Sequence, residues 1–534
     1  MDTTPETQAS TIQIDSTDVD YYLSNLASDD FLGRKPFTEG ETKTVDFLVS
    51  EFEKMGLAPG NGDSYIQEVP LVEITGQPAL SMTLKGPGGN ADLEIGKDYV
   101  FHTQREQAEI NLNDAELVFC GYGVVAPEYN WNDYAGIDME GKIAVVMVND
   151  PGFASEDSTF FKGKTMTYYG RWTYKYEEAA RQGAAGILII HETNAAGYPW
   201  FVVSSSWADG KLGLQSPNGN MDRAAIEGWV SLGTASKIFK ASGMTQGRFF
   251  EKAQTPGFEP IPLGVTVSTS LTNTYKKDAS QNVVAMIEGS EYPEEYIIYT
   301  AHWDHLGVGE VVNGDSIYNG AIDNGSGTAA VLSIAKAFAK MPEAPKRSIV
   351  FLMVTAEEQG LLGSAYYAQN PIFPVNQTVA NLNIDAMASY GATKDLVIVG
   401  YGQSELEDYA SDFAEKQDRY VVPDLEPGKG YFFRSDHFSF AKVGIPALYA
   451  AGGTDHITKG KEYGEQKNQE YTANNYHRPG DQYNPEEWDL GGIVQDAQLY
   501  FEIGKKLGNE NTFPKWKEGS EFKAIRERSL KPKG

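Results

Sequence analysis

Histidines and carboxylates stand at the ends of apolar, strand-like runs in the second half of this chain. The run 296–300 is rich in β-branched and aromatic residues, which predicts a buried strand, and His302 and Asp304 follow it directly. Side chains of the same kinds end later runs or lie in loops: Asp323, Glu357, Glu358, Asp385 and His477. Because ligands bind where the strands of an open α/β sheet end, we expect these side chains to converge.

Imidazole nitrogens and carboxylate oxygens are ligands that suit zinc and other first-row divalent ions. Five such ligands are too many for one catalytic zinc ion, which keeps one position open for water or substrate. They suffice for two ions that share a bridging carboxylate. The sequence therefore predicts a two-metal site at this edge of the sheet.

Glu357 and Glu358 are adjacent, and neighbouring side chains at a strand end diverge. If one of them binds a metal ion, the other can face a water molecule on that ion and act as general base. A solvated acidic pair at a helix start is the alternative, since acidic residues favour the positive end of the helix dipole. The other candidate ligands at strand ends favour the first interpretation.

Sequence signatures of other hydrolases are absent. The chain has no HExxH, no GxSxG and no GxxxxGK[ST] sequence. Its single cysteine, Cys120, lies in a strand-like run, which indicates packing rather than nucleophilic attack. One cysteine also rules out an intramolecular disulfide.

Strand-like and helical stretches must position these side chains. From about residue 282 they alternate with short connections, which predicts a mostly parallel sheet covered on both faces. Residues 42–55 form a strongly amphipathic pattern that ends at Gly56, which predicts a helix. The block 115–270 mixes strands with two helices and has no clustered metal ligands, so we expect a separate inserted domain with a lid, specificity or purely structural role.

The net charge and the hydropathy of the sequence exclude some classes of binding partner. The formal net charge of −30 argues against binding to nucleic acid and to anionic membrane surfaces. No apolar run approaches the length of a membrane helix. The polar start, residues 1–17, resembles the disordered tether of a processed exported protein, so we expect a periplasmic or secreted protein; a cytoplasmic location is the alternative.

Six motifs, taken together, indicate a known family: HWDHLG, AIDNGSGTA, TAEEQGLLGS, NIDA, FRSDHFSF and YHRPGD. They resemble the co-catalytic dizinc aminopeptidases, a family that includes glutamate-carboxypeptidase-like enzymes. The resemblance implies a three-layer α/β catalytic domain, with a mixed, mostly parallel sheet flanked by helices, over 18–114 and 271–510. It implies that 115–270 is a β-rich α/β protease-associated domain; residues 511–534 would be a tail.

The resemblance also implies a role for each residue. Two zinc ions, or other divalent ions, would be held by five residues: His302 and Asp385 on the first, Glu358 and His477 on the second, and Asp323 between them. Glu357 would be the general base that activates water, Asp304 would fix the tautomer of His302, and Tyr476 would steady the oxyanion. The substrate would be a peptide that loses its N-terminal residue.

Three other functions stay open at this point. A carboxypeptidase of the same family needs a cationic pocket, for which Arg434 is the candidate. A glutaminyl-cyclase-like transferase works with one zinc ion. A receptor-like binding protein would have lost ligands, whereas every ligand position is filled here. The sequence does not indicate the side-chain preference, the native metal or the oligomeric state.

Overall fold

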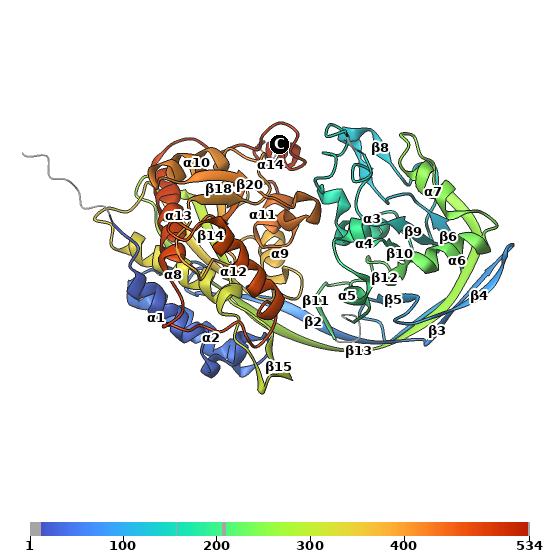
Figure 1. Cartoon of the computed structure of the whole chain (residues 1–534), viewed down its shortest axis with the longest axis horizontal. Coiled ribbons are helices and arrows are strands. Elements are labelled where there is room, and N and C mark those ends of the chain that lie inside the picture. The colour runs from blue at the N-terminus through green and yellow to red at the C-terminus, as the bar shows by residue number, and fades with distance from the viewer. Residues whose placement is uncertain (1–11, 156, 206–209, 532–534) are drawn as a thin grey trace, which may run out of the picture. The chain divides into compact units, whose positions relative to one another are not determined.

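A computed structural model of the chain describes residues 12–155, 157–205 and 210–531. Residues 1–11 of the expected tether and 532–534 of the expected tail lie outside the described residues. The chain divides into two compact units (Figure 1). The first comprises the residues up to Val69 together with 279–425 and 434–534, and the second comprises 70–278 and 426–433.

The first unit contains a mixed sheet in which most neighbours are parallel. Its main strands are β13 (Ile261–Ile287, from residue 279 on), β14 (Tyr292–His302), β17 (Arg347–Val354), β18 (Thr378–Asn383), β19 (Asp395–Ile398), β20 (Tyr420–Pro423) and β21 (Ala447–Gly452). β14 lies parallel to β17 and β18, β18 to β21, and β19 to β20. β13 and β19 join antiparallel to β17 and β21. The short strand β1 (Ala58–Pro59) and the hairpin of β15 (Gly307–Val312) and β16 (Asp315–Tyr318) complete the strands of this unit.

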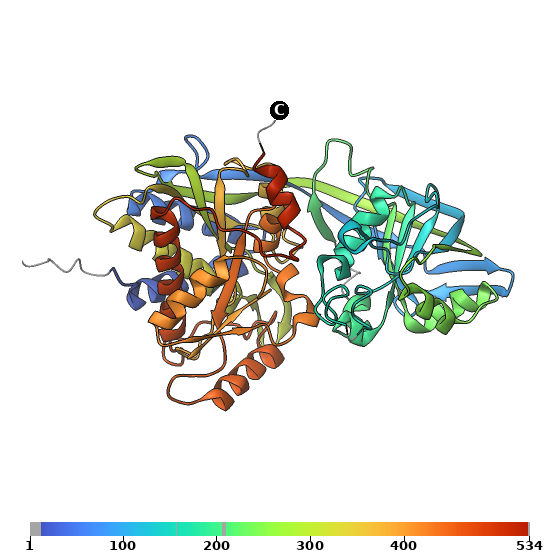
Figure 2. The ribbon, with the colours of Figure 1, turned by 90° about the horizontal axis from the view of Figure 1, so that it is seen from above.

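Helices cover both faces of this sheet, which makes three layers (Figure 2). The helices are α1 (Ser16–Leu26), α2 (Glu39–Met55), α8 (Gly327–Ala339), α9 (Leu362–Gln369), α10 (Leu406–Lys416), α11 (His437–Lys442), α12 (Lys461–Asn474), α13 (Gly491–Asn509) and α14 (Lys523–Ser529). Along β14, Ile297 and Tyr299 join the core beneath α1, α2, α8 and α13, whereas Ile298 joins the core beneath α9 and α11. Successive strand residues point to opposite faces, so a strand buried on both faces is an unbroken apolar run. The predicted fold class is confirmed.

The predicted helix over 42–55 is confirmed as the larger part of α2, which begins at Glu39. Gly56 follows it with φ 75°, and its N–H donates to the carbonyl of Glu53. Glycine adopts this left-handed conformation without the steric cost that a Cβ brings.

The second unit has its own apolar cores. Its strands are β2 (Ile66–Pro78), β3 (Ser81–Gly86), β4 (Gly89–Glu94), β5 (Tyr99–His102), β6 (Glu109–Phe119), β7 (Val125–Ala126), β8 (Trp131–Asn132), β9 (Ile143–Met147), β10 (Gly186–His191), β11 (Lys211–Leu214), β12 (Ile226–Ser231) and the first part of β13. Its helices are α3 (Trp172–Arg181), α4 (Thr193–Ala196), α5 (Trp200–Ser205), α6 (Leu232–Ala241) and α7 (Gln246–Ala253). β6, β9, β10 and β12 are parallel neighbours in that order.

The second unit starts earlier than the inserted block that the sequence pattern suggested. Residues 70–114 belong to it because their strands pair with strands of the insertion: β5 with β12 and β3 with β13. None of the helices in the described part of the chain is both long and apolar enough to cross a membrane.

Candidate metal centre

Two loops of the first unit position the candidate ligands His302 and Asp323, and one buried arginine binds both loops. β14 ends at His302, and a second loop leads to Asp323 ahead of α8. The guanidinium of Arg34 donates to the carbonyl of Trp303 at 2.8 Å in the first loop, and to the carbonyl of Gly320 at 2.8 Å in the second. Arg34 is 1% exposed, so this clamp is part of the core.

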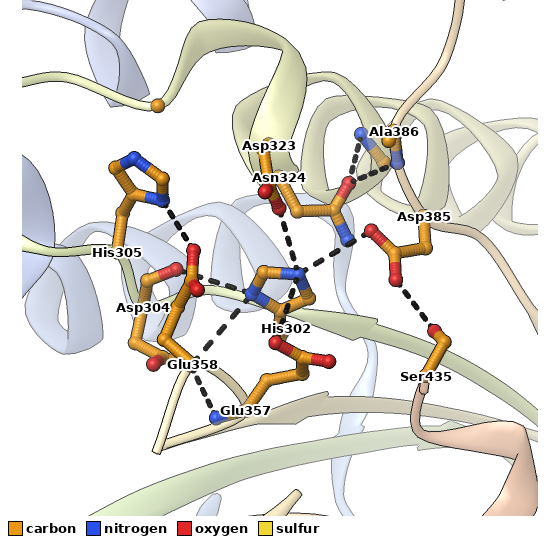
Figure 3. A network of polar contacts seen from close by, with 12 residues as sticks. His302, Asp304, His305, Asp323, Asn324, Glu357, Glu358, Asp385, Ala386 and Ser435 are labelled. Atoms are coloured by element: carbon orange, nitrogen blue, oxygen red, sulfur yellow. Dashed lines mark hydrogen bonds and ion pairs between the residues drawn. The ribbon is translucent and has the colours of Figure 1, made fainter. Parts of the chain in front are cut away.

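The first donor group comprises His302, Asp323 and Asp385 (Figure 3). Nε2 of His302 lies 3.3 Å from Oδ1 of Asp323 and 3.4 Å from Oδ1 of Asp385. Ligand atoms bound at roughly 2.0 Å to a tetrahedral zinc ion are about 3.3 Å apart. Among the described residues Nε2 makes no well-aligned hydrogen bond although it is buried. A cation between these three atoms would satisfy it.

The second donor group comprises Asp323, Glu358 and His477. Nε2 of His477 lies 3.3 Å from Oδ2 of Asp323 and 3.1 Å from Oε2 of Glu358. Asp323 therefore turns one carboxylate oxygen to each group, as a carboxylate that bridges two metal ions would. All five predicted ligands lie around this one point, and their atom types and spacings fit two divalent ions.

Glu357 lies beside the first group and is held by its backbone. Its N–H donates to Oδ1 of Asp304 at 3.0 Å, and its Oε2 is 3.9 Å from Nε2 of His302. Burial raises the pKa of Glu357 well above its usual range; His302 opposes this rise and Asp385 adds to it. A bound cation would favour the ionised form.

Asp304 acts on His302 mainly through its backbone. Nδ1 of His302 is 3.1 Å from the carbonyl oxygen of Asp304 but 3.8 Å from its carboxylate Oδ1. A carbonyl can only accept, so it favours the tautomer with the proton on Nδ1 and leaves Nε2 free to bind a metal. The carboxylate instead accepts from the N–H of Glu357.

Two further residues hold candidate ligands in place, Ser435 and Asp481. Ser435 donates from Oγ to Oδ2 of Asp385 at 2.5 Å (Figure 3). Asp481 accepts from the N–H groups of Ile322 and Asp323, at 2.9 and 3.1 Å. Both lie within the motifs FRSDHFSF and YHRPGD, so the motif boundaries were the available signal.

Tyr476 precedes His477, and its ring stacks on the imidazole with a centroid separation of 3.9 Å. The side chain is 46% exposed. It therefore borders the second donor group on a side that solvent reaches.

Comparison with known proteins agrees with this site. Residues 282–502 match peptidase family M28. This matched part of the chain is similar to an M28 peptidase domain. All five candidate ligands and Glu357 lie within the matched residues.

Two relatives match parts of the chain. Aminopeptidase NAALADL1 of Mus musculus is 34% identical over 146 residues, which are 26% of this chain and 18% of that protein. An aminopeptidase of Pseudomonas aeruginosa is 25% identical over 374 residues, which are 69% of this chain and 56% of that protein. The chain thus spans less than a fifth of the length of the mouse relative.

A solved structure shares the fold over nearly the whole chain. The aminopeptidase from Aneurinibacillus sp. strain AM-1 superposes with a TM-score of 0.50 and 19% sequence identity, covering 94% of this chain and 96% of that one. The likeness shows that the mixed sheet of the first unit, flanked by helices, occurs in an aminopeptidase structure.

Proposed function

We propose that this chain is a dizinc exopeptidase that removes N-terminal residues from peptides. The observation that carries the proposal is the placement of Asp323, whose Oδ1 faces His302 at 3.3 Å while its Oδ2 faces His477 at 3.3 Å. One carboxylate shared between two donor groups is what a pair of neighbouring ions requires. The relatives that are named aminopeptidases support the choice of reaction.

In this proposal His302 and Asp385 hold the first ion, and Glu358 and His477 hold the second. The ions, when bound, supply a Lewis acid for the peptide carbonyl and lower the pKa of a water molecule. The backbone hydrogen bonds to Asp481 fix Asp323, and Ser435 fixes Asp385, so the ligands are oriented before substrate binds.

Glu357 is proposed as the general base. It accepts a proton from the attacking water and then donates that proton to the leaving amine. Its burial favours the protonated carboxyl that exists between the two steps, which supports the uptake of the proton from water. Tyr476 is placed beside His477, where its hydroxyl is proposed to donate to the developing oxyanion.

The second unit, residues 70–278 with 426–433, is proposed as a protease-associated domain that affects substrate choice. Its own apolar cores support a separately folded module. The periplasmic or secreted location expected from the sequence stays a prediction, and cell fractionation tests it.

A panel of substrates assayed together with metal analysis tests the proposed function. Aminoacyl-anilides and unblocked peptides should be hydrolysed, N-blocked peptides should not, and the active enzyme should hold two zinc ions per chain. Preferential cleavage of N-blocked peptides at the C-terminus would favour the carboxypeptidase, and an active enzyme with one ion would favour the glutaminyl-cyclase-like transferase. Two bound ions without any hydrolysis would favour a binding protein.

A further inference from the structure

His305 is a buried histidine of the first unit for which the proposed reaction has no use. It is 1% exposed, and its Nδ1 lies 2.6 Å from Oε1 of Glu358 (Figure 3). Oε2 of the same carboxylate faces His477 at 3.1 Å. Each carboxylate oxygen of Glu358 therefore contacts a different histidine.

The distances separate His305 from the proposed ligands. Nitrogen–oxygen distances among the proposed ligands are 3.1–3.4 Å. This matches the distance between two ligand atoms that are bound to the same tetrahedral zinc ion. The His305–Glu358 contact of 2.6 Å leaves no room for an ion between the two atoms, although the two atoms are not aligned for a hydrogen bond. His305 thus contacts the oxygen of Glu358 that does not face His477.

The backbone of two neighbouring loops restricts the position of the His305 ring. Gly320 has φ +56°, and a Cβ there would lie 2.4 Å from Cγ of His305. The carbonyl of Gly320 is bound by Arg34, and the carbonyl of Arg34 accepts from the N–H of His305 at 3.4 Å. Only glycine at position 320 leaves space for the imidazole of His305 while Arg34 binds both loops.

We propose that His305 is a positioning residue that binds the outer oxygen of Glu358 and so restricts this carboxylate to one oxygen on the second ion. The inference rests on the two-metal site proposed above and deepens it. Residues that orient a ligand in this way change metal affinity by about 10–100-fold.

The alternative is that His305 is itself a ligand, because its donor atom and those of Asp323 and Glu358 all lie within 4.8 Å of one another. Three substitutions separate the two roles. The amide nitrogen of His305→Asn falls near the place of Nδ1 and can contact the same oxygen of Glu358, but an amide nitrogen does not bind zinc. In His305→Gln the amide falls near the place of Nε2, away from Glu358, and His305→Ala removes every donor.

The experiment titrates Zn²⁺ and Co²⁺ into the metal-free full chain and its variants, with metal content per chain, calorimetry and the visible spectrum of the cobalt form as readouts. We expect His305→Ala and His305→Gln to weaken the second ion about 10–100-fold and to leave the first unchanged. We expect His305→Asn to bind both ions within about threefold of wild type, with a wild-type cobalt spectrum. The matched control is His456→Asn, which replaces a histidine of the same unit that is 3% exposed and accepts from the N–H groups of Thr458 and Lys459. It should bind both ions normally.

Wild-type affinity in all three His305 variants would overturn the inference, as would a His305→Asn variant that binds as weakly as His305→Ala. In the second case a changed cobalt spectrum in His305→Asn would identify the ring as a ligand. Either result leaves two ions in the wild-type enzyme and the proposed function intact. A wild-type chain that binds fewer than two ions would instead contradict the two-metal site, and the inference with it. Thermal unfolding of the metal-free variants shows whether they fold; if His305→Ala does not, the contrast between Asn and Gln carries the test.

Discussion

At the scale of single residues, Glu357 and Glu358 are adjacent in sequence but differ in their electrostatic surroundings. Burial raises the pKa of Glu357 well above its usual range. Burial and Asp323 act in the same direction on Glu358, but His305 and His477 outweigh them and hold its pKa at about 2. Two carboxyl groups whose surroundings push their pKa values apart are suited to different tasks. The group that stays ionised suits a metal ligand, and the other suits a proton carrier.

The substitution Glu357→Gln tests this division of tasks. It keeps the shape and burial of the side chain but removes its ability to accept a proton, so we expect kcat to fall by about 10²–10⁴-fold. Because Glu357 is not among the proposed ligands, the variant should still hold two zinc ions. Metal analysis and steady-state kinetics on the same preparation check both statements. Near-normal turnover would remove the general-base assignment, and loss of an ion would make Glu357 a ligand.

The proposed ligands could be picked out from sequence because each stands at a strand end or in a loop that a recognisable apolar run or motif marks. The residues that hold them could not be assigned in the same way. Arg34 acts on a carbonyl 269 positions away, that of Trp303, and Ser435 acts on Asp385 from 50 positions away. Such contacts arise from tertiary packing, and no local pattern of apolar and polar residues encodes them.

At the scale of elements, the antiparallel pair β5 and β12 places a histidine against a buried acid. His102 and Glu227 are register partners, with Nε2 of His102 3.7 Å from Oε2 of Glu227. Burial lowers the pKa of His102 from 6.5 to about 3, and the cations Lys211 and Arg223 add to this effect. The folded second unit therefore keeps His102 neutral under conditions in which the unfolded chain binds a proton.

This linkage predicts how stability changes with pH. At about pH 7.5 and above, well over the usual pKa of 6.5, His102 is neutral in both states and contributes no slope. As pH falls from 6.5 to 5, the unfolded chain gains the proton, so the free energy of unfolding falls by at most about 1.4 kcal/mol per pH unit. His102→Gln should reduce this slope in denaturant unfolding of the second unit. An unchanged slope would show that His102 titrates normally. His191, whose pKa burial also lowers, accounts for part of the remainder.

Elements with an apolar stripe were predictable, and those without one were not. The pattern over 42–55 predicts most of α2, whose buried face includes Val45, Leu48 and Phe52. The helix α12 buries only Gly464, so its sequence has no periodic apolar signal and gave no prediction. The start of the second unit at residue 70 was missed for a different reason, since strand pairing between distant segments decides to which sheet a strand belongs.

At the scale of the whole molecule, every proposed metal ligand belongs to one of the two units. The five residues span 302 to 477, and all lie in the first unit, whereas the second unit has its own buried cores. A ligand that binds the folded state alone stabilises it by RT ln(1 + [L]/Kd), which is about 2.7 kcal/mol at 100 times Kd. Metal should therefore stabilise one unit and not the other.

Removal of metal with a chelator should lower one unfolding transition and leave the other in place. We expect calorimetry to show the first unit melting about 5 °C or more below its zinc-loaded temperature, because that unit alone loses the binding free energy. The transition of the second unit is identified independently, since His102→Gln shifts it relative to wild type at pH 5.5 and should not move the metal-dependent one. A chelator that lowers both transitions equally would mean that the metal stabilises the chain as one cooperative body, and one that lowers neither would contradict a metal site formed by these five ligands.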